Sequence, residues 1–84
     1  MYEYKTKGTC STKISFDIQD GAVRDVVFTN GCQGNLKTIG LLVEGMNAGE
    51  LVSRLKGIQC GQRRTSCADQ LARAVEERIG HQAP

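Results

Sequence analysis

The stretch KISFDIQDGAVRDVVFT, residues 13–29, decides the fold of this chain. Its first six residues, 13–18, alternate polar and apolar side chains, which is the period of a half-buried strand. The pair Asp20-Gly21 that follows is a strong hairpin turn signal. Residues 23–29 are rich in β-branched side chains and therefore predict the return strand of an antiparallel hairpin.

The return strand does not alternate regularly, because Val26, Val27 and Phe28 are consecutive. Either a β-bulge or burial on both faces of the sheet would explain this run. Before the hairpin, residues 2–7 read as a short additional strand. The N-terminal part of the chain thus predicts a three-stranded antiparallel sheet.

Helical patterns follow the strands. After a glycine-rich break at residues 30–35, apolar positions recur from Leu36 to Val43 at the spacing of one helical face, and Gly45 would end that helix. A second helix is expected to begin at Asn47, with Glu50 at the third helical position as in a capping box, and to stop at Gly57.

The third helix is predicted to begin at the similar cap Ser66-Cys67-Ala68-Asp69 and to end at Gly80. Strands first and helices afterwards predict an α+β fold, with three helices packed on one face of the sheet. We expect residues 1–80 to form a single domain and residues 81–84 to form a flexible tail.

Composition excludes several classes of protein. With 84 residues there is no room for a large-substrate enzyme with its own cofactor domain, and we expect no enzyme activity from the chain alone. The longest apolar stretch, residues 39–43, is too short to span a membrane. The net charge is +2 and the longest basic run is Arg63-Arg64, so no nucleic-acid partner is expected. Because residues 1–5 lack a signal-peptide pattern, we expect a cytoplasmic protein.

The four cysteines Cys10, Cys32, Cys60 and Cys67 each fall at a break between predicted elements. Cysteines that serve only as small hydrophobic side chains are usually buried within elements. In a reducing cytosol, four cysteines indicate metal ligation or thiol chemistry rather than disulfides. Cys32 and Cys67 would also stand at helix N-termini, where the dipole favours an anionic sulfur.

The spacing leaves three functions open. The chain has no C-x-x-C motif, so a metal site would have to be assembled by the fold from distant loops. The first interpretation is one site for Zn²⁺ or an iron–sulfur cluster, in a scaffold, carrier or accessory module. The second is a thiol-redox accessory domain, and the third is a protein-interaction domain whose cysteines only pack. Asp69 is interpreted as a helix cap rather than a catalytic acid.

Three segments resemble the TSCPD domain family: CGQRRTSCADQL at residues 60–71, GCQGN at 31–35 and KGTCS at 7–11. The resemblance covers residues 2–78 and includes all four cysteines. Ala68 stands where the family usually has proline. Proline in the first turn of a helix only fixes the backbone in a helical conformation, so alanine should leave the cysteines in place. The resemblance implies either a stand-alone four-cysteine protein or a relative of the C-terminal region of cobalamin-dependent ribonucleotide reductases. A ribonucleotide reductase is therefore one protein partner that the resemblance implies.

The chain also resembles iron–sulfur scaffolds of the NifU/IscU type, which likewise run from strands to helices. Cys10, Cys32 and Cys67 match, in order, the three cysteine positions of that family. Residues 45–51 are similar to its second helical segment. The resemblance implies that Cys60 would be a fourth ligand, where the scaffolds use a group other than cysteine.

Overall fold

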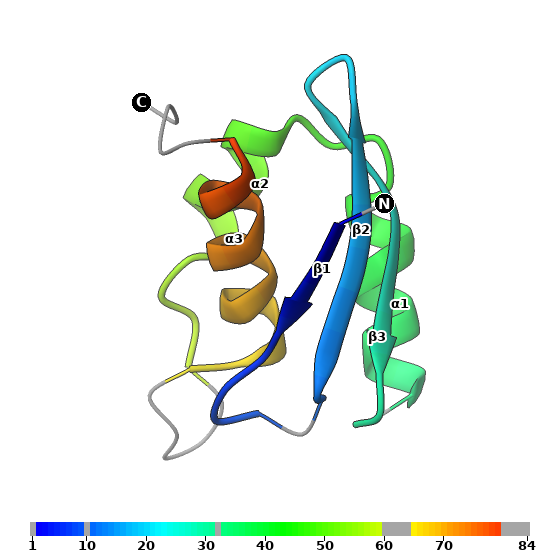
Figure 1. Cartoon of the computed structure of the whole chain (residues 1–84), viewed down its shortest axis with the longest axis vertical. Coiled ribbons are helices and arrows are strands. Elements are labelled where there is room, and N and C mark those ends of the chain that lie inside the picture. The colour runs from blue at the N-terminus through cyan, green and yellow to red at the C-terminus, as the bar shows by residue number, and fades with distance from the viewer. Residues whose placement is uncertain (1, 10, 32, 60–64, 80–84) are drawn as a thin grey trace.

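The computed structural model describes residues 2–9, 11–31, 33–59 and 65–79. Within these residues the chain forms three strands followed by three helices (Figure 1). The strands are β1 (Tyr2–Lys5), β2 (Lys13–Gln19) and β3 (Ala22–Thr29), and the helices are α1 (Gln33–Val43), α2 (Ala48–Leu55) and α3 (Cys67–Arg78). The predicted α+β class, a three-stranded antiparallel sheet followed by helices, is confirmed.

The sheet has the order β1-β2-β3, and both pairings are antiparallel. The turn between β2 and β3 is formed by Asp20 and Gly21, whose φ angles are 53° and 77°. Positive φ at both central residues is the requirement of the tight turn that matches the twist of two strands. The hairpin predicted from residues 13–29 is therefore confirmed.

A bulge interrupts the pairing of β2 with β3. Ser15 pairs with Val27 and Asp17 pairs with Arg24, so Phe16 lies opposite two residues of β3 instead of one. One of these two is Asp25, whose φ of 56° accommodates the extra residue. Of the two explanations for the irregular alternation, the bulge is confirmed, since Val27 stays 55% exposed while Phe28 is buried.

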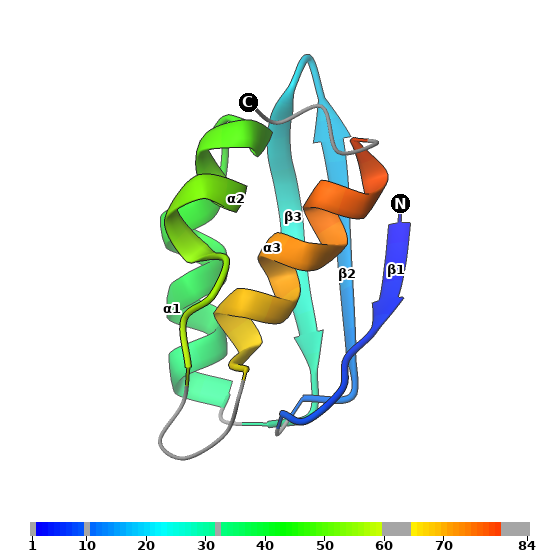
Figure 2. The ribbon, with the colours of Figure 1, turned by 90° about the vertical axis from the view of Figure 1, so that its left-hand side faces the viewer.

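One hydrophobic core lies between the sheet and the helices. Figure 2 shows α3 crossing in front of the sheet and α1 running beside β3, and α2 packs against α3. The core combines one face of β2 and β3 with apolar faces of all three helices. Its buried members are Ile14, Phe16, Val23, Phe28, Leu36, Val43, Ala48, Leu51, Val52, Leu71, Ala72, Ala74 and Val75.

Helix α1 begins earlier than the sequence predicts. Its predicted face is confirmed, since Leu36 and Val43 are buried, but it starts at Gln33 instead of Leu36. Glycine has a low helix propensity, so Gly34 disfavours a helix here. This preference is weak, and the packing of the apolar face of α1 overrides it. On the outer side of α1, Leu41 and Leu42 are 71% and 72% exposed.

Both predicted helix caps are present. The side chain of Asn47 accepts a hydrogen bond from the Glu50 N–H at 3.0 Å. The hydroxyl of Ser66 likewise accepts one from the Asp69 N–H at 3.0 Å. These bonds define where α2 and α3 begin. No helix in the described part of the chain is both long enough and apolar enough to cross a membrane.

Candidate functional site

The segments that adjoin the predicted thiol ligands gather at one end of the molecule. The connection from β1 to β2, the C-terminal end of β3 and the N-terminal ends of α1 and α3 all lie there (Figure 2). Of the four predicted ligands the structure describes Cys67, whereas Cys10, Cys32 and Cys60 lie outside the described residues. Among the described residues, no group of three or more His, Cys, Asp or Glu side chains could hold a metal ion.

Cys67 is the first helical residue of α3, directly after the N-cap Ser66, as predicted. Its side chain is half-buried, and its Sγ lies 3.2 Å from the hydroxyl oxygen of Ser11. Ser11 is only 2% exposed and follows Cys10 in the sequence. Ser11, the sequence neighbour of the predicted ligand Cys10, is therefore in direct contact with the predicted ligand Cys67.

A second pair of contacts joins the segment after Cys10 to the segment before Cys32. The Thr12 N–H donates to the Thr29 carbonyl at 2.8 Å, and the Asn30 side-chain amide donates to the Thr12 hydroxyl at 3.1 Å. Hydrogen bonds thus connect the described sequence neighbours of Cys10 both to Cys67 and to the chain that leads to Cys32.

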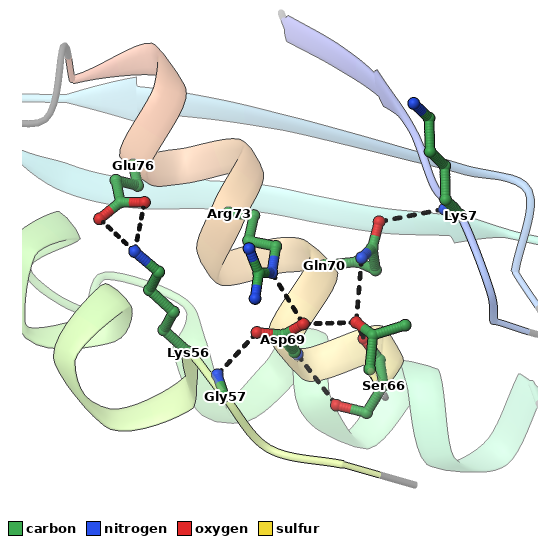
Figure 3. Close-up of polar contacts among 9 residues, drawn as sticks. Lys7, Lys56, Gly57, Ser66, Asp69, Gln70, Arg73 and Glu76 are labelled. Atoms are coloured by element: carbon green, nitrogen blue, oxygen red, sulfur yellow. Dashed lines mark hydrogen bonds and ion pairs between the residues drawn. The ribbon is translucent and has the colours of Figure 1, made fainter. Parts of the chain in front are cut away.

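Asp69 of α3 is completely buried, and its carboxylate joins several segments (Figure 3). It accepts hydrogen bonds from the Gly57 N–H at 2.6 Å, from the Thr65 hydroxyl and from Arg73 Nε at 2.9 Å. Burial acts to raise the pKa of Asp69. The hydrogen bonds from Thr65, Gly57 and Arg73 outweigh burial and hold this pKa below its ordinary value. Asp69 is therefore an anion with its donors already in place.

Gln70, which is 6% exposed, extends this arrangement to the first connection of the sheet. Its amide nitrogen donates to the Thr65 hydroxyl at 2.9 Å, and its amide oxygen accepts from the Lys7 N–H at 3.0 Å. A Cβ on Gly8 would lie 3.2 Å from the Thr65 methyl group, so the two connections approach closely. We call Thr65, Asp69 and Gln70 the polar clamp.

The polar clamp was not predicted from the sequence. Asp69 was interpreted only as a helix cap, and its N–H does take part in the cap of α3. Its carboxylate, however, binds the chain on both sides of residues 58–64. The one available signal was the presence of two polar residues, Asp69 and Gln70, immediately before the apolar residues Leu71 and Ala72.

Cys67 begins α3, and its sulfur contacts the segment between β1 and β2. The N-terminus of α3 presents the positive end of the helix dipole. The Ser11 hydroxyl lies at hydrogen-bonding distance from the sulfur, and either atom can be the donor. Thiolates are the ligands that Zn²⁺ and iron–sulfur clusters prefer. Cys67 is one such sulfur, but the described residues alone do not form a metal site.

Comparison with protein-family models matches residues 2–79 to the TSCPD domain. The match includes the positions of all four cysteines and of the polar clamp. No curated protein and no solved structure matches the chain.

Proposed function

The chain belongs to the TSCPD domain family, and we propose that it holds one metal centre through Cys10, Cys32, Cys60 and Cys67. The centre is a Zn²⁺ ion or an iron–sulfur cluster, since both take a set of thiolates. The observation that supports this proposal is the contact between Ser11 and Cys67, which brings the chain beside Cys10 to the sulfur of Cys67.

Further support comes from the way the described neighbours of the cysteines are tied together. Hydrogen bonds join Thr12 to Thr29 and Asn30, which precede Cys32 in the sequence by three and two residues. The carboxylate of Asp69 holds both sides of the segment that carries Cys60. A site assembled from loops far apart in the sequence requires such connections, because the chain has no C-x-x-C motif to preassemble it.

The choice of metal decides the role. A closed shell of four thiolates around Zn²⁺ leaves no open position for chemistry. Its contribution would be folding free energy for a small interaction module, with another protein as its partner. A labile iron–sulfur cluster would instead make the domain a carrier. In either case the family supports an accessory role beside a larger enzyme, with a ribonucleotide reductase as the candidate.

Elemental analysis of protein purified without added metal tests the proposal. We expect about one equivalent of Zn²⁺, or iron with matching sulfide, and its loss when any of the four cysteines is changed to serine. The matched control is Ser53→Ala, because Ser53 lies on the exposed side of α2, and it should retain the metal. Metal-free folded protein with four free thiols would overturn the proposal. Metal-free protein with reversible disulfides would favour the thiol-redox alternative instead.

A further inference from the structure

The outer side of α1 exposes two adjacent leucines. Leu41 and Leu42 are 71% and 72% exposed, so neither belongs to the core. Single exposed apolar side chains are normal on a protein surface, but Leu42 also forms a wall of an apolar groove of about 470 Å³ between α1 and α2. The other apolar residues that line this groove are Ile39, Val43, Met46, Leu55 and Ala68. A contiguous exposed apolar surface of this kind marks an interaction site.

Charged residues of opposite sign flank this surface along α1. Lys37, Leu41 and Glu44 follow one another at intervals of four and three residues, which places them on one side of the helix. That side adjoins β3, because Lys37 and Val27 line the same hollow and Glu44 accepts a hydrogen bond from the Asp25 N–H at 2.9 Å. No carboxylate of the described residues forms an ion pair with Lys37.

We propose that the outer side of α1 is an interface between two copies of this chain, with the two α1 helices antiparallel about a two-fold axis near Leu41. Two-fold dimers are the commonest homo-oligomers, and their interface uses the same surface on both subunits. In this arrangement Lys37 of one copy faces Glu44 of the other, and the axis repeats the pair. The inference goes beyond the proposed metal centre and does not rest on it, because no cysteine takes part.

Charge complementarity favours a second copy with this orientation. Parallel helices would place Lys37 beside Lys37 and Glu44 beside Glu44, and like charges that face each other across an interface are costly. Glu44 can accept a further contact, because its side chain is 41% exposed although it also pairs with Arg24. Arg54, at the rim of the groove, is already paired with Glu50 of its own helix, so the groove brings no unpaired charge into the interface.

A membrane surface fits α1 less well than a second copy does. Helices that lie on membranes carry several basic residues on their polar face, whereas Lys37 is the only charged residue within α1. Helices also bind other proteins by laying an apolar face into a hydrophobic groove. Here one chain has both parts, since the exposed leucines of α1 adjoin the groove that the α1 helix of a second copy would fill.

Analytical ultracentrifugation of the protein as purified tests the proposal. A concentration series at low ionic strength contains a reducing agent, so that no disulfide can link two copies. We expect the mass to rise from 9.1 kDa to twice this value. Leu42→Glu should raise the dissociation constant of the dimer by about thirtyfold or more, as changes at central interface residues do. Circular dichroism checks that each variant is folded.

A charge exchange tests the antiparallel pairing itself. Lys37→Glu and Glu44→Lys each place like charges opposite each other, and each should dimerise about tenfold more weakly alone. When the two variants are mixed, both pairs again join opposite charges, so the heterodimer should form about as tightly as the wild-type dimer. Added salt should weaken the wild-type dimer and strengthen the Lys37→Glu dimer. If Glu44→Lys does not fold, this opposite response to salt still tests the pairing.

Lys5→Glu is the matched control, because it makes the same charge reversal at an exposed lysine of β1, at the edge of the sheet away from α1 (Figure 2). It should dimerise as wild type does. A wild-type protein that stays at 9.1 kDa even at millimolar concentration would overturn the proposal and leave this surface to a different protein or to a membrane. A dimer that does not respond to Leu42→Glu would also overturn it, and one that responds to Leu42→Glu but to neither charge reversal would overturn the antiparallel arrangement.

Discussion

The hydroxyl oxygen of Ser11 lies 3.2 Å from the Sγ of Cys67, across 56 positions of the chain. The carbonyl of Ser11 accepts from the Thr6 and Thr9 hydroxyls, so the backbone at Ser11 is held in place independently of its side chain. The Thr9 and Ser11 hydroxyl oxygens are also 3.2 Å apart. The hydroxyl groups of Thr9 and Ser11 therefore form a short series of contacts that ends at the sulfur, and of the two only Ser11 is buried.

We predict that Ser11→Ala alters the metal–thiolate bond without unfolding the protein. A hydrogen bond to a metal-bound sulfur withdraws electron density, so its loss should move the sulfur-to-metal charge-transfer band of the Co²⁺-loaded protein to lower energy. Affinity for Co²⁺ should fall by about tenfold, as for other outer partners of metal ligands. Absorption spectroscopy during a Co²⁺ titration gives both quantities.

Ser11→Thr keeps the hydroxyl group and is expected to restore the band. Thr9→Val should have a smaller effect in the same direction, because Thr9 contacts Ser11 rather than the sulfur. An unchanged band in Ser11→Ala would show that the Ser11 hydroxyl does not donate to Cys67 in the metal-loaded protein.

A second prediction concerns acid stability. The pKa of Asp69 in the folded protein lies below its ordinary value, which is about 3.9 in an unfolded chain. Its contribution to the free energy of unfolding is thus fully present near pH 7 and is lost as the pH falls through the folded-state pKa. We expect Asp69→Asn to be less stable at pH 7, and this difference from wild type should shrink as the pH falls below about 3.9, the ordinary value.

Urea unfolding in the presence of a chelator measures this difference without the contribution of metal. The control is Asp17→Asn, because Asp17 lies in β2 and its carboxylate accepts a hydrogen bond from the neighbouring Ile18 N–H. A stability difference between wild type and Asp69→Asn that stays constant with pH would show that the charge of Asp69 contributes nothing.

Local signals in the sequence predicted the elements well. The alternation of residues 13–18, the pair Asp20-Gly21 and the caps at Asn47 and Ser66 depend on interactions within a few residues, and each is found in the structure. Helix α1 includes Gln33, Gly34 and Asn35, which were predicted to lie in a glycine-rich break. That prediction was wrong because the low helix propensity of Gly34 is a weak signal.

The candidate site was predictable only in outline. The sequence indicates that Cys67 begins a helix, and this is confirmed. The contact of Cys67 with Ser11 and the bonds of Asp69 to Gly57 depend on how distant segments meet, which no local pattern encodes. The joint metal site of Cys10, Cys32, Cys60 and Cys67 stays a prediction.

A third prediction tests the cap of α2. Asn47→Ala removes the acceptor for the Glu50 N–H and should lower the free energy of unfolding by about 1 kcal/mol. Asn47→Ser keeps a capping oxygen and should remain close to wild type. Urea unfolding measures both variants. Zn²⁺ affinity should not change in either, because α2 begins at the end of the molecule opposite to the start of α3 (Figure 1). An Asn47→Ala variant as stable as wild type would contradict this assignment.

The last prediction uses two glycines of the same helix. A Cβ on Gly40 would lie 3.0 Å from the backbone carbonyl oxygen of Val26, whereas a Cβ on Gly34 would meet nothing within 4 Å. In an unobstructed helix, alanine is favoured over glycine by up to about 1 kcal/mol. Gly34→Ala should therefore raise the midpoint of thermal unfolding.

Gly40→Ala gains the same intrinsic preference but must push α1 away from β3, because the obstacle is backbone and cannot rotate aside. Moving the helix would loosen the packing of Leu36 and Val43, which are both buried in the core. Overpacked core substitutions typically cost about 1–3 kcal/mol, which exceeds the gain in helix propensity. We therefore expect Gly40→Ala to unfold at a lower temperature than wild type, in a direction opposite to Gly34→Ala. Stabilisation by both substitutions would mean that α1 does not approach β3 as closely as the structure shows.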